Sequence, residues 1–168
     1  MEIFSYVISG ELEHKDSMGN GRTIKAGEFQ YMSAGHGVEH SEFNSSSGNP
    51  VHFLQIWLQP RTPGGEPRYH DYNLLAHAAG RPLTLIASPD GRDDSIAIRA
   101  EGEIHFGHLK NDRILKNVSS RERHWIHLIS GELTIEGETI KPGDGVAIEG
   151  DLPELGASQE SSFFLFSF

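Results

Sequence analysis

The chain has 168 residues and a formal net charge of −10, from 14 Lys and Arg against 24 Asp and Glu. This acidic balance argues against direct binding to nucleic acid or to a membrane surface, and no apolar run is long enough to span a bilayer. The absence of cysteine excludes disulfides, thiolate metal ligands and a cysteine nucleophile, and it fits a reducing compartment, so we predict a cytoplasmic location. The ten histidines are the unusual figure.

Short β-strands follow one another along the whole chain, because runs of β-branched and aromatic residues alternate with Gly, Asn and Ser clusters. Three prolines and two glycines within 60–67 predict a linker, and 72–79 is predicted to form one or two helical turns. Asn20-Gly21 and Glu136-Gly137 are typical of tight reversals. Trp57 and Trp125 lie in apolar strands and are predicted to be core residues. The predicted strands are 3–9, 11–15, 28–33, 51–59, 83–87, 96–99, 103–109, 113–118, 125–130, 132–135, 146–148 and 163–168.

An internal repeat indicates the architecture. VISGEL at 7–12 matches LISGEL at 128–133, and TIKAGE at 23–28 matches TIKPGD at 139–144. The hairpin between the two motifs is five residues longer in the first copy, so two equivalent β units are implied, one on each side of the linker.

The order of these motifs resembles the cupin barrel in both halves. More narrowly, 6–21 (YVISGELEHKDSMGNG) followed by 27–42 (GEFQYMSAGHGVEHSE) closely resembles the pirin family, and 81–168 resembles its C-terminal cupin more loosely. The resemblance implies an all-β fold of two cupin (double-stranded β-helix, or jelly-roll) units. The implied domains are a partial N-terminal cupin at 1–60, a linker at 61–80 and a C-terminal cupin at 81–168.

The resemblance also implies a metal site. Pirins hold one divalent metal, usually iron, through a His-x-His pair, a third histidine and a glutamate; the last two map onto His40 and Glu42. Met1-Glu2-Ile3 begins partway through the motif that carries the His-x-His pair, and this sequence lacks both of those histidines. Mn, Ni and Cu are the alternatives to iron, and a site without metal is the other expectation.

Spacing and donor chemistry also support His40 and Glu42 as candidate metal ligands. On a strand, His40 and Glu42 point to one face, and an imidazole with a carboxylate suits Fe(II), Mn(II) or Ni(II). Glu42 is also the candidate base for a substrate hydroxyl proton. Two donors are too few for a facial triad, so we expect an incomplete site. His36 is interpreted as a loop residue or a substitute ligand, and His14, beside charged neighbours, as a solvated residue.

The second repeat is predicted to be structural. Its His124 and His127 are three residues apart and should point to opposite faces of a strand. The first unit, by contrast, should be an incomplete barrel with an exposed edge. We expect one of three explanations: a marginal open barrel, a homodimer that covers the edge, or a shortened or misannotated product, the last being preferred.

Two functions from different classes follow. One is a metal-dependent dioxygenase of the quercetin 2,3-dioxygenase type, which acts on a flavonol-like aromatic substrate. The other is a non-enzymatic binding module, or a remnant, that has lost its metal site. A role as a transcription cofactor is a weaker third hypothesis, which rests on family analogy alone.

Overall fold

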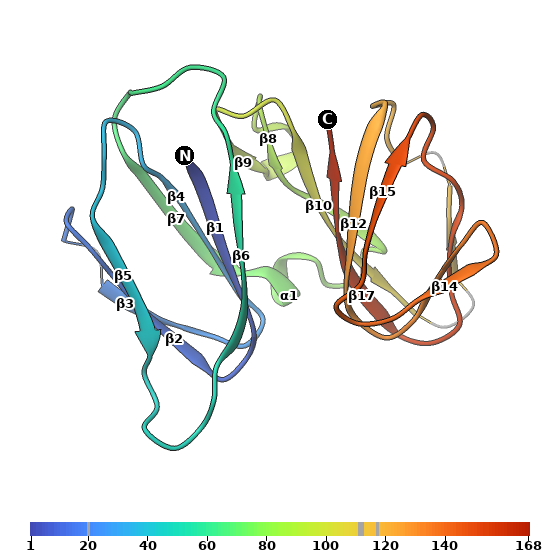
Figure 1. The fold of residues 1–168 in the computed structure, drawn as a ribbon, viewed down its shortest axis with the longest axis horizontal. Helices are drawn as coiled ribbons and strands as arrows, with labels where there is room; N and C mark the ends of the chain where they lie inside the picture. Colours follow the sequence, from blue (N-terminus) through green and yellow to red (C-terminus); the bar gives the residue numbers. More distant parts are fainter. Residues whose placement is uncertain (20, 111–112, 117) are drawn as a thin grey trace. The chain divides into compact units, whose positions relative to one another are not determined.

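The computed structural model describes residues 1–19, 21–110, 113–116 and 118–168, and nearly all of its regular structure is β (Figure 1). The first part contains seven strands and a helix: β1 Glu2–Ser9, β2 Glu11–Asp16, β3 Gly21–Lys25, β4 Glu28–Ser33, β5 His40–Asn44, β6 His52–Leu58, β7 Arg68–Asn73 and α1 Leu74–His77. The remainder contains β8 Leu83–Ser88, the 3₁₀ turn η1 Arg92–Asp94, β9 Ile96–Ala97, β10 Glu103–Leu109, β11 Arg113–Leu115, β12 Arg123–Ser130, β13 Leu133–Ile135, β14 Glu138–Ile140, β15 Gly145–Glu149, β16 Leu155–Ala157 and β17 Ser161–Ser167. The all-β prediction is confirmed.

The chain forms two compact units. Unit 1 comprises Met1–His77 with Ile98–Ala100, and unit 2 comprises Ala78–Ala97 with Glu101–Phe168. The segment predicted as a linker, 61–80, contains a strand that sequence reasoning missed: β7 pairs with β4, with Tyr69 opposite Met32 and Asp71 opposite Gln30. The Pro- and Gly-rich part before β7 lacks regular structure, because proline cannot donate to a strand ladder.

Unit 1 contains two sheets, in the strand orders β6-β1-β4-β7 and β3-β2-β5. Val7, Leu12 and Ile24, one from each of β1, β2 and β3, form a buried apolar cluster, with Phe53 of β6 packed against it. Alternation along each strand then assigns the inward positions. On β1 the inward residues are Ile3, Ser5 and Val7; on β6 they are Phe53, Gln55 and Trp57, which lie opposite them.

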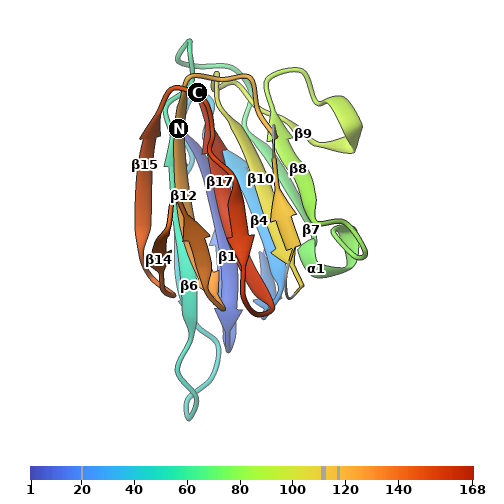
Figure 2. The ribbon, with the colours of Figure 1, turned by 90° about the vertical axis from the view of Figure 1, so that its right-hand side faces the viewer.

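Unit 2 repeats this plan with more strands. Figure 2 shows its larger sheet, whose strand order is β15-β12-β17-β10-β8-β9. The strand order of the smaller sheet is β11-β16-β13-β14. Leu128, Leu133, Phe163 and Leu165 are fully buried in its core. The ring of Phe163 fills the space above Gly107, where an added Cβ would lie 2.2 Å from it.

The sequence repeat corresponds to a repeat of strands. The order β6-β1-β4 of unit 1 matches β17-β12-β15 of unit 2, and β3-β2-β5 matches β14-β13-β16. Unit 2 has further strands, among them β10 beside β17 and β11 beside β16, which have no counterpart beside β6 and β5 in the described part of unit 1. Among the described residues, the two sheets of unit 1 therefore contain fewer strands than those of unit 2.

Two local predictions have different outcomes. Glu136-Gly137 joins β13 to β14 with φ of 51° and 86°, as a tight hairpin turn requires, whereas Asn20 lies outside the described residues. The prediction that both tryptophans are core residues is wrong: Trp57 is 55% exposed and Trp125 is 43% exposed. Trp57 lies on a strand at the end of its sheet, and Trp125 lies on the face of β12 opposite the core, over Gly145.

Among the described residues, no helix is long and apolar enough to cross a membrane.

Candidate metal centre

Two neighbouring strands of unit 1 bring ionisable side chains together on the inner face. β2 and β5 run antiparallel, with His14 opposite Glu42 and Asp16 opposite His40. In each strand the two residues are at positions i and i+2, with one residue between them, so all four side chains point to the same side of the sheet. Directly opposed residues of an antiparallel pair have Cβ atoms about 5 Å apart, which brings imidazoles and carboxylates into contact distance.

Three of these residues can offer donor atoms to one ion. One nitrogen each of His14 and His40 and one oxygen of Glu42 all lie within 4.8 Å of one another. His14 Nδ1 is 3.8 Å from Glu42 Oε1, and the rings of His14 and His40 are 5.7 Å apart between centroids. The side chain of His14 is fully buried and that of Glu42 is one-tenth exposed. The arrangement is therefore a compact and nearly enclosed set of two imidazoles and one carboxylate.

The Glu42 carboxylate is held by one donor on each oxygen. Ser5 Oγ donates to Oε1 at 2.8 Å, and Gln55 Nε2 donates to Oε2 at 2.6 Å. Both donors occupy inward positions of the opposite sheet, where Ser5 lies directly opposite Gln55. A carboxylate has about four lone-pair sites, so two hydrogen bonds fix its orientation and leave acceptor capacity for a cation.

Polar side chains lie near both ring nitrogens of His14. Gln30 Nε2 lies 3.1 Å from its Nδ1, and the Tyr69 hydroxyl donates to Gln30 Oε1 at 3.2 Å. Burial raises the pKa of Tyr69, which keeps this hydroxyl protonated as a donor. On the other side, Asp16 Oδ2 lies 3.6 Å from His14 Nε2, while Asp16 Oδ1 accepts the Met18 N–H.

The donors fit a divalent cation. His14 Nε2 and His40 Nδ1 are buried nitrogens without a hydrogen-bond partner among the described residues. An unsatisfied buried nitrogen costs about 1–3 kcal/mol, so two of them in one cluster require an explanation. Two imidazoles and a carboxylate form the donor set of the facial triad that binds Fe(II), and imidazole also suits Ni. The three donors therefore fit a divalent metal.

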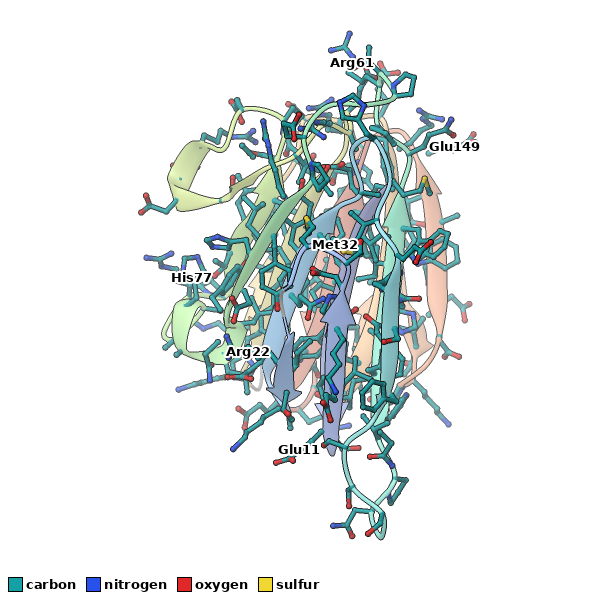
Figure 3. The ribbon with its side chains drawn as sticks, turned by 90° about the vertical axis from the view of Figure 1, so that its left-hand side faces the viewer. Glu11, Arg22, Met32, Arg61, His77 and Glu149 are labelled. Carbon is teal, nitrogen blue, oxygen red and sulfur yellow. The ribbon has the colours of Figure 1, made fainter. Side chains whose placement is uncertain are left out.

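Charged residues also line the adjoining part of the inner face. Arg22, opposite His14 on β3, pairs with Asp71 of β7 and with Glu28 of β4 at 2.9 Å. Arg22 and Met32, both labelled in Figure 3, come from different strands of the unit; Met32 is buried and lies opposite Ile3 and Tyr69. The ion pairs neutralise the guanidinium, so Arg22 adds no unpaired positive charge beside the donors.

The structure changes how the histidines predicted from sequence are interpreted. His40 and Glu42 lie together as the i, i+2 rule predicts, and their role as ligands stays a prediction. The interpretation of His14 as a solvated residue is wrong, because β2 directs it inward beside the fully buried Leu12. His36 is absent from the cluster: its side chain is 69% exposed and its Nε2 lies 4.0 Å from Glu66.

Unit 2 contains buried histidines of a different kind. As predicted, His124 and His127 differ in environment: His124 is buried, with Nδ1 2.9 Å from Ser167 Oγ, and His127 is half-buried. His105 is buried, and the burial lowers its pKa more than the nearby Glu103 raises it. Among the described residues of unit 2, no three His, Asp or Glu side chains bring donor atoms together as in unit 1.

Acidification should destabilise the protein through His105. Its pKa is lowered in the folded state, so the unfolded chain takes up the proton first, near pH 6.5. The contribution to stability is complete above that pH and is lost as the pH falls toward the folded pKa, with a slope of up to about 1.4 kcal/mol per pH unit. Urea unfolding between pH 7.5 and 5 should show this slope, and His105→Gln should reduce it. An equal reduction by His36→Gln, at an exposed position, would contradict the assignment.

Comparisons with known proteins are consistent with an arrangement of two cupin-like units. Residues 1–58 match the model of the Pirin family, and residues 85–168 match that of the quercetinase C-terminal cupin domain. Quercetin 2,3-dioxygenase of Escherichia coli (strain K12) is 39% identical over 168 residues, which cover 99% of this chain and 71% of that protein. A putative quercetin 2,3-dioxygenase of Pasteurella multocida (strain Pm70) is 38% identical, with 99% and 72% covered.

A solved structure shares the fold at the same level of similarity. The bacterial pirin YhhW from Escherichia coli, in complex with nickel(II), superposes with a TM-score of 0.91 at 37% identity, over 100% of this chain and 72% of that one. The two family models match separate parts of the chain that correspond to the two repeats. Both units are therefore cupins, and the chain belongs to the pirin family.

Proposed function

We propose that unit 1 binds one divalent metal through His14, His40 and Glu42, and that this centre supports a dioxygenase reaction on a flavonol-like substrate. The observation that carries the proposal is the convergence of two imidazoles and a carboxylate within 4.8 Å, with two imidazole nitrogens unsatisfied. His14 supplies the third donor that a facial triad requires. The nickel(II) complex of the related pirin supports Ni(II) beside Fe(II) as a metal to test.

The metal, when bound, would supply a Lewis acid and a template for the two adjacent oxygens of a flavonol. The chain's own residues prepare that position. Ser5 and Gln55 hold both oxygens of Glu42, and Gln30 and Asp16 flank the ring of His14. Preorganised groups of this kind avoid the cost of reorienting side chains when a ligand binds.

Glu42 is the proposed base for the substrate hydroxyl proton. Its carboxylate is part of the donor cluster and retains one-tenth exposure, so it is the acidic side chain of the set that a ligand can reach. The hydrogen bonds from Ser5 and Gln55 fix the orientation of its two oxygens and leave acceptor capacity on each. Glu42→Gln should therefore reduce turnover more strongly than it reduces flavonol binding.

The substrate class comes from the relatives. Two of them are named quercetin 2,3-dioxygenase or putative quercetin 2,3-dioxygenase, which supports an aromatic flavonol as the compound to test first. The absence of cysteine is consistent with a reducing compartment, and a cytoplasmic location stays part of the proposal. The competing hypothesis, a non-enzymatic module, requires that no stoichiometric metal is bound.

Protein purified without chelators should contain about one divalent metal per chain by elemental analysis. Reconstituted with Fe(II) or Ni(II), it should cause oxygen-dependent loss of flavonol absorbance. His40→Ala should lower metal affinity at least 100-fold, since loss of an orienting partner alone typically costs 10–100-fold. His36→Ala is the matched control, because His36 is exposed outside the cluster.

Two results separate the parts of the proposal. Metal content far below one per chain in the wild-type protein, after reconstitution, would exclude the centre and favour the non-enzymatic module. Full metal content without flavonol turnover would retain the centre and exclude this substrate class.

A further inference from the structure

Unit 2 contains a small cavity that is lined by basic side chains. Its volume is about 120 Å³, and its described lining consists of Gly80, Arg81, Pro82, His108, Lys110 and Arg113. The first three residues precede β8, His108 lies near the end of β10, and Lys110 and Arg113 lie where the chain passes from β10 to β11. The described lining includes no Asp or Glu, although the chain has 24 acidic residues against 14 Lys and Arg. The cavity is therefore a locally positive site on an acidic protein.

Backbone hydrogen bonds hold the three lining segments together. The His108 N–H donates to the Pro82 carbonyl at 3.0 Å, and the Arg113 N–H donates to the Lys110 carbonyl at 3.3 Å. Arg113 is also the first residue of β11, where it pairs with Ala157 of β16. The backbone positions from which the basic side chains extend are thus fixed by the fold of unit 2.

His108 forms a wall of the cavity with both ring nitrogens engaged. Its Nδ1 lies 3.0 Å from Ser162 Oγ, on the residue directly opposite in β17, and its Nε2 lies 3.0 Å from Glu160 Oε1. The carboxylate of Glu160 is therefore occupied by the histidine. Positive charge for a ligand must come from the arginines and the lysine.

The side chains of Arg81, Lys110 and Arg113 are exposed and have no ion pair or hydrogen bond among the described residues. Lys116, just beyond β11, differs from them because it pairs with Glu154. Asp112 follows Lys110 closely in the sequence and lies outside the described residues; three positive charges against this one negative charge still leave a net charge of +2. The cations at the cavity are therefore available to an external anion.

Size and charge together select the ligand. The volume of 120 Å³ exceeds the roughly 30 Å³ of a water molecule and falls short of the roughly 300 Å³ at which drug-sized ligand sites begin. A phosphate group carries a charge of about −1.5 to −2 at pH 7, whereas a simple carboxylate carries a single charge. Arginine also matches phosphate geometry, since its planar guanidinium donates two parallel hydrogen bonds to one phosphate.

We propose that this cavity binds a phosphate group, either as the free ion or as the end of a small phosphate monoester. The two arginines clamp the phosphate oxygens, and Lys110 adds a third positive charge. Because these side chains are exposed, the remainder of an ester extends into solvent. The site lies within unit 2 and does not depend on metal binding in unit 1.

The phosphorus NMR signal of inorganic phosphate should broaden saturably when the full chain is added at low salt. Exposed ion pairs are individually weak, so we expect a dissociation constant of order 1 mM. Raising sodium chloride to about 0.5 M should weaken binding at least 5-fold, because salt screens exposed charges. Failure to saturate below about 20 mM phosphate at low salt would overturn the proposal.

Single substitutions locate the site. Arg81→Gln and Arg113→Gln should each weaken phosphate binding at least about 3-fold, and the double variant at least about 10-fold. Lys141→Gln is the matched control, because it removes one positive charge at an exposed position of unit 2 outside the cavity lining. Its affinity should remain within about 1.5-fold of the wild type, since a distant exposed charge is screened. Equal weakening by Lys141→Gln would show that only overall charge matters and would overturn the site.

Three comparisons identify the ligand and exclude the metal centre as the binding place. Stronger binding of inorganic phosphate than of methyl phosphate would support the free ion as the ligand, and equal or stronger binding of methyl phosphate would support a monoester. Acetate binding as tightly as phosphate would overturn the selection of a dianion. Loss of phosphate binding in His40→Ala, with wild-type affinity in Arg81→Gln, would place the phosphate at unit 1 and overturn the proposal.

Discussion

Replacing His14 with alanine should abolish stoichiometric metal binding as completely as replacing His40. His14 supplies one of three donors, and two donors leave most coordination positions to water, with weak and unselective binding. We expect metal affinity to fall at least 100-fold, measured by competition with a chromophoric chelator. A site that depended only on His40 and Glu42 would instead leave the affinity of His14→Ala close to that of the wild type.

Two further variants separate ligation from packing. His14 is fully buried, so alanine also creates a cavity, whereas His14→Gln retains most of the volume and a polar group beside Gln30. If His14 is a ligand, both variants should lose the metal. If His14→Gln retained full affinity with the wild-type unfolding midpoint, His14 would have a packing role, and the proposed centre would need another third donor.

His14 shows why sequence reasoning captured part of the site. His40 and Glu42 were predicted from the resemblance to the pirin family together with their i, i+2 spacing. Alternation from Leu12 also predicts an inward His14, but the neighbouring charges of Lys15 and Asp16 suggested a solvated residue. The position of His14 beside the other donors is set by the pairing register of β2 and β5, which places His14 opposite Glu42. Pairing register depends on contacts between distant segments, which a single sequence does not specify.

Part of the fold was likewise predicted from the sequence, and part was missed. The repeat of VISGEL and LISGEL predicted two equivalent units, and the matching strand orders confirm it. β7 was missed because its segment follows the prolines of 60–67 and contains polar residues such as His70 and Asp71. Its alternating Tyr69 and Asp71 face the polar interior around the donors, where the usual rule of apolar residues inside does not hold.

The buried Glu2 should be the residue whose loss costs unit 1 most stability. Its carboxylate is fully buried and accepts the Tyr31 hydroxyl at 2.5 Å, the Ser33 hydroxyl at 2.6 Å and the Arg99 backbone N–H at 3.0 Å. Burial, followed by the hydrogen bond to Glu2, raises the pKa of Tyr31, so that this donor stays protonated. These bonds join β1, β4 and the segment Ile98–Ala100 within one unit.

Glu2→Ala leaves the buried Tyr31 and Ser33 hydroxyls and the part-buried Arg99 backbone N–H without this acceptor, at about 1–3 kcal/mol each, so we expect a loss of at least about 3 kcal/mol in the free energy of unfolding. Total stabilities of 5–15 kcal/mol are typical, so the loss should be evident in urea unfolding at pH 7. Glu11→Ala, at an exposed glutamate labelled in Figure 3, should change stability by less than about 0.5 kcal/mol. A loss below 1 kcal/mol in Glu2→Ala would contradict the network.

Metal binding provides a second test of the same variant. Glu2 points outward on β1 while Ser5, which holds Glu42, points inward, so Glu2→Ala removes stability without removing a metal donor. A metal at 100 times its dissociation constant should then restore about 2.7 kcal/mol by binding the folded state. The restoration should disappear when Glu2→Ala is combined with His14→Ala. Persistence of the effect in the double variant would place the metal outside the cluster of His14, His40 and Glu42.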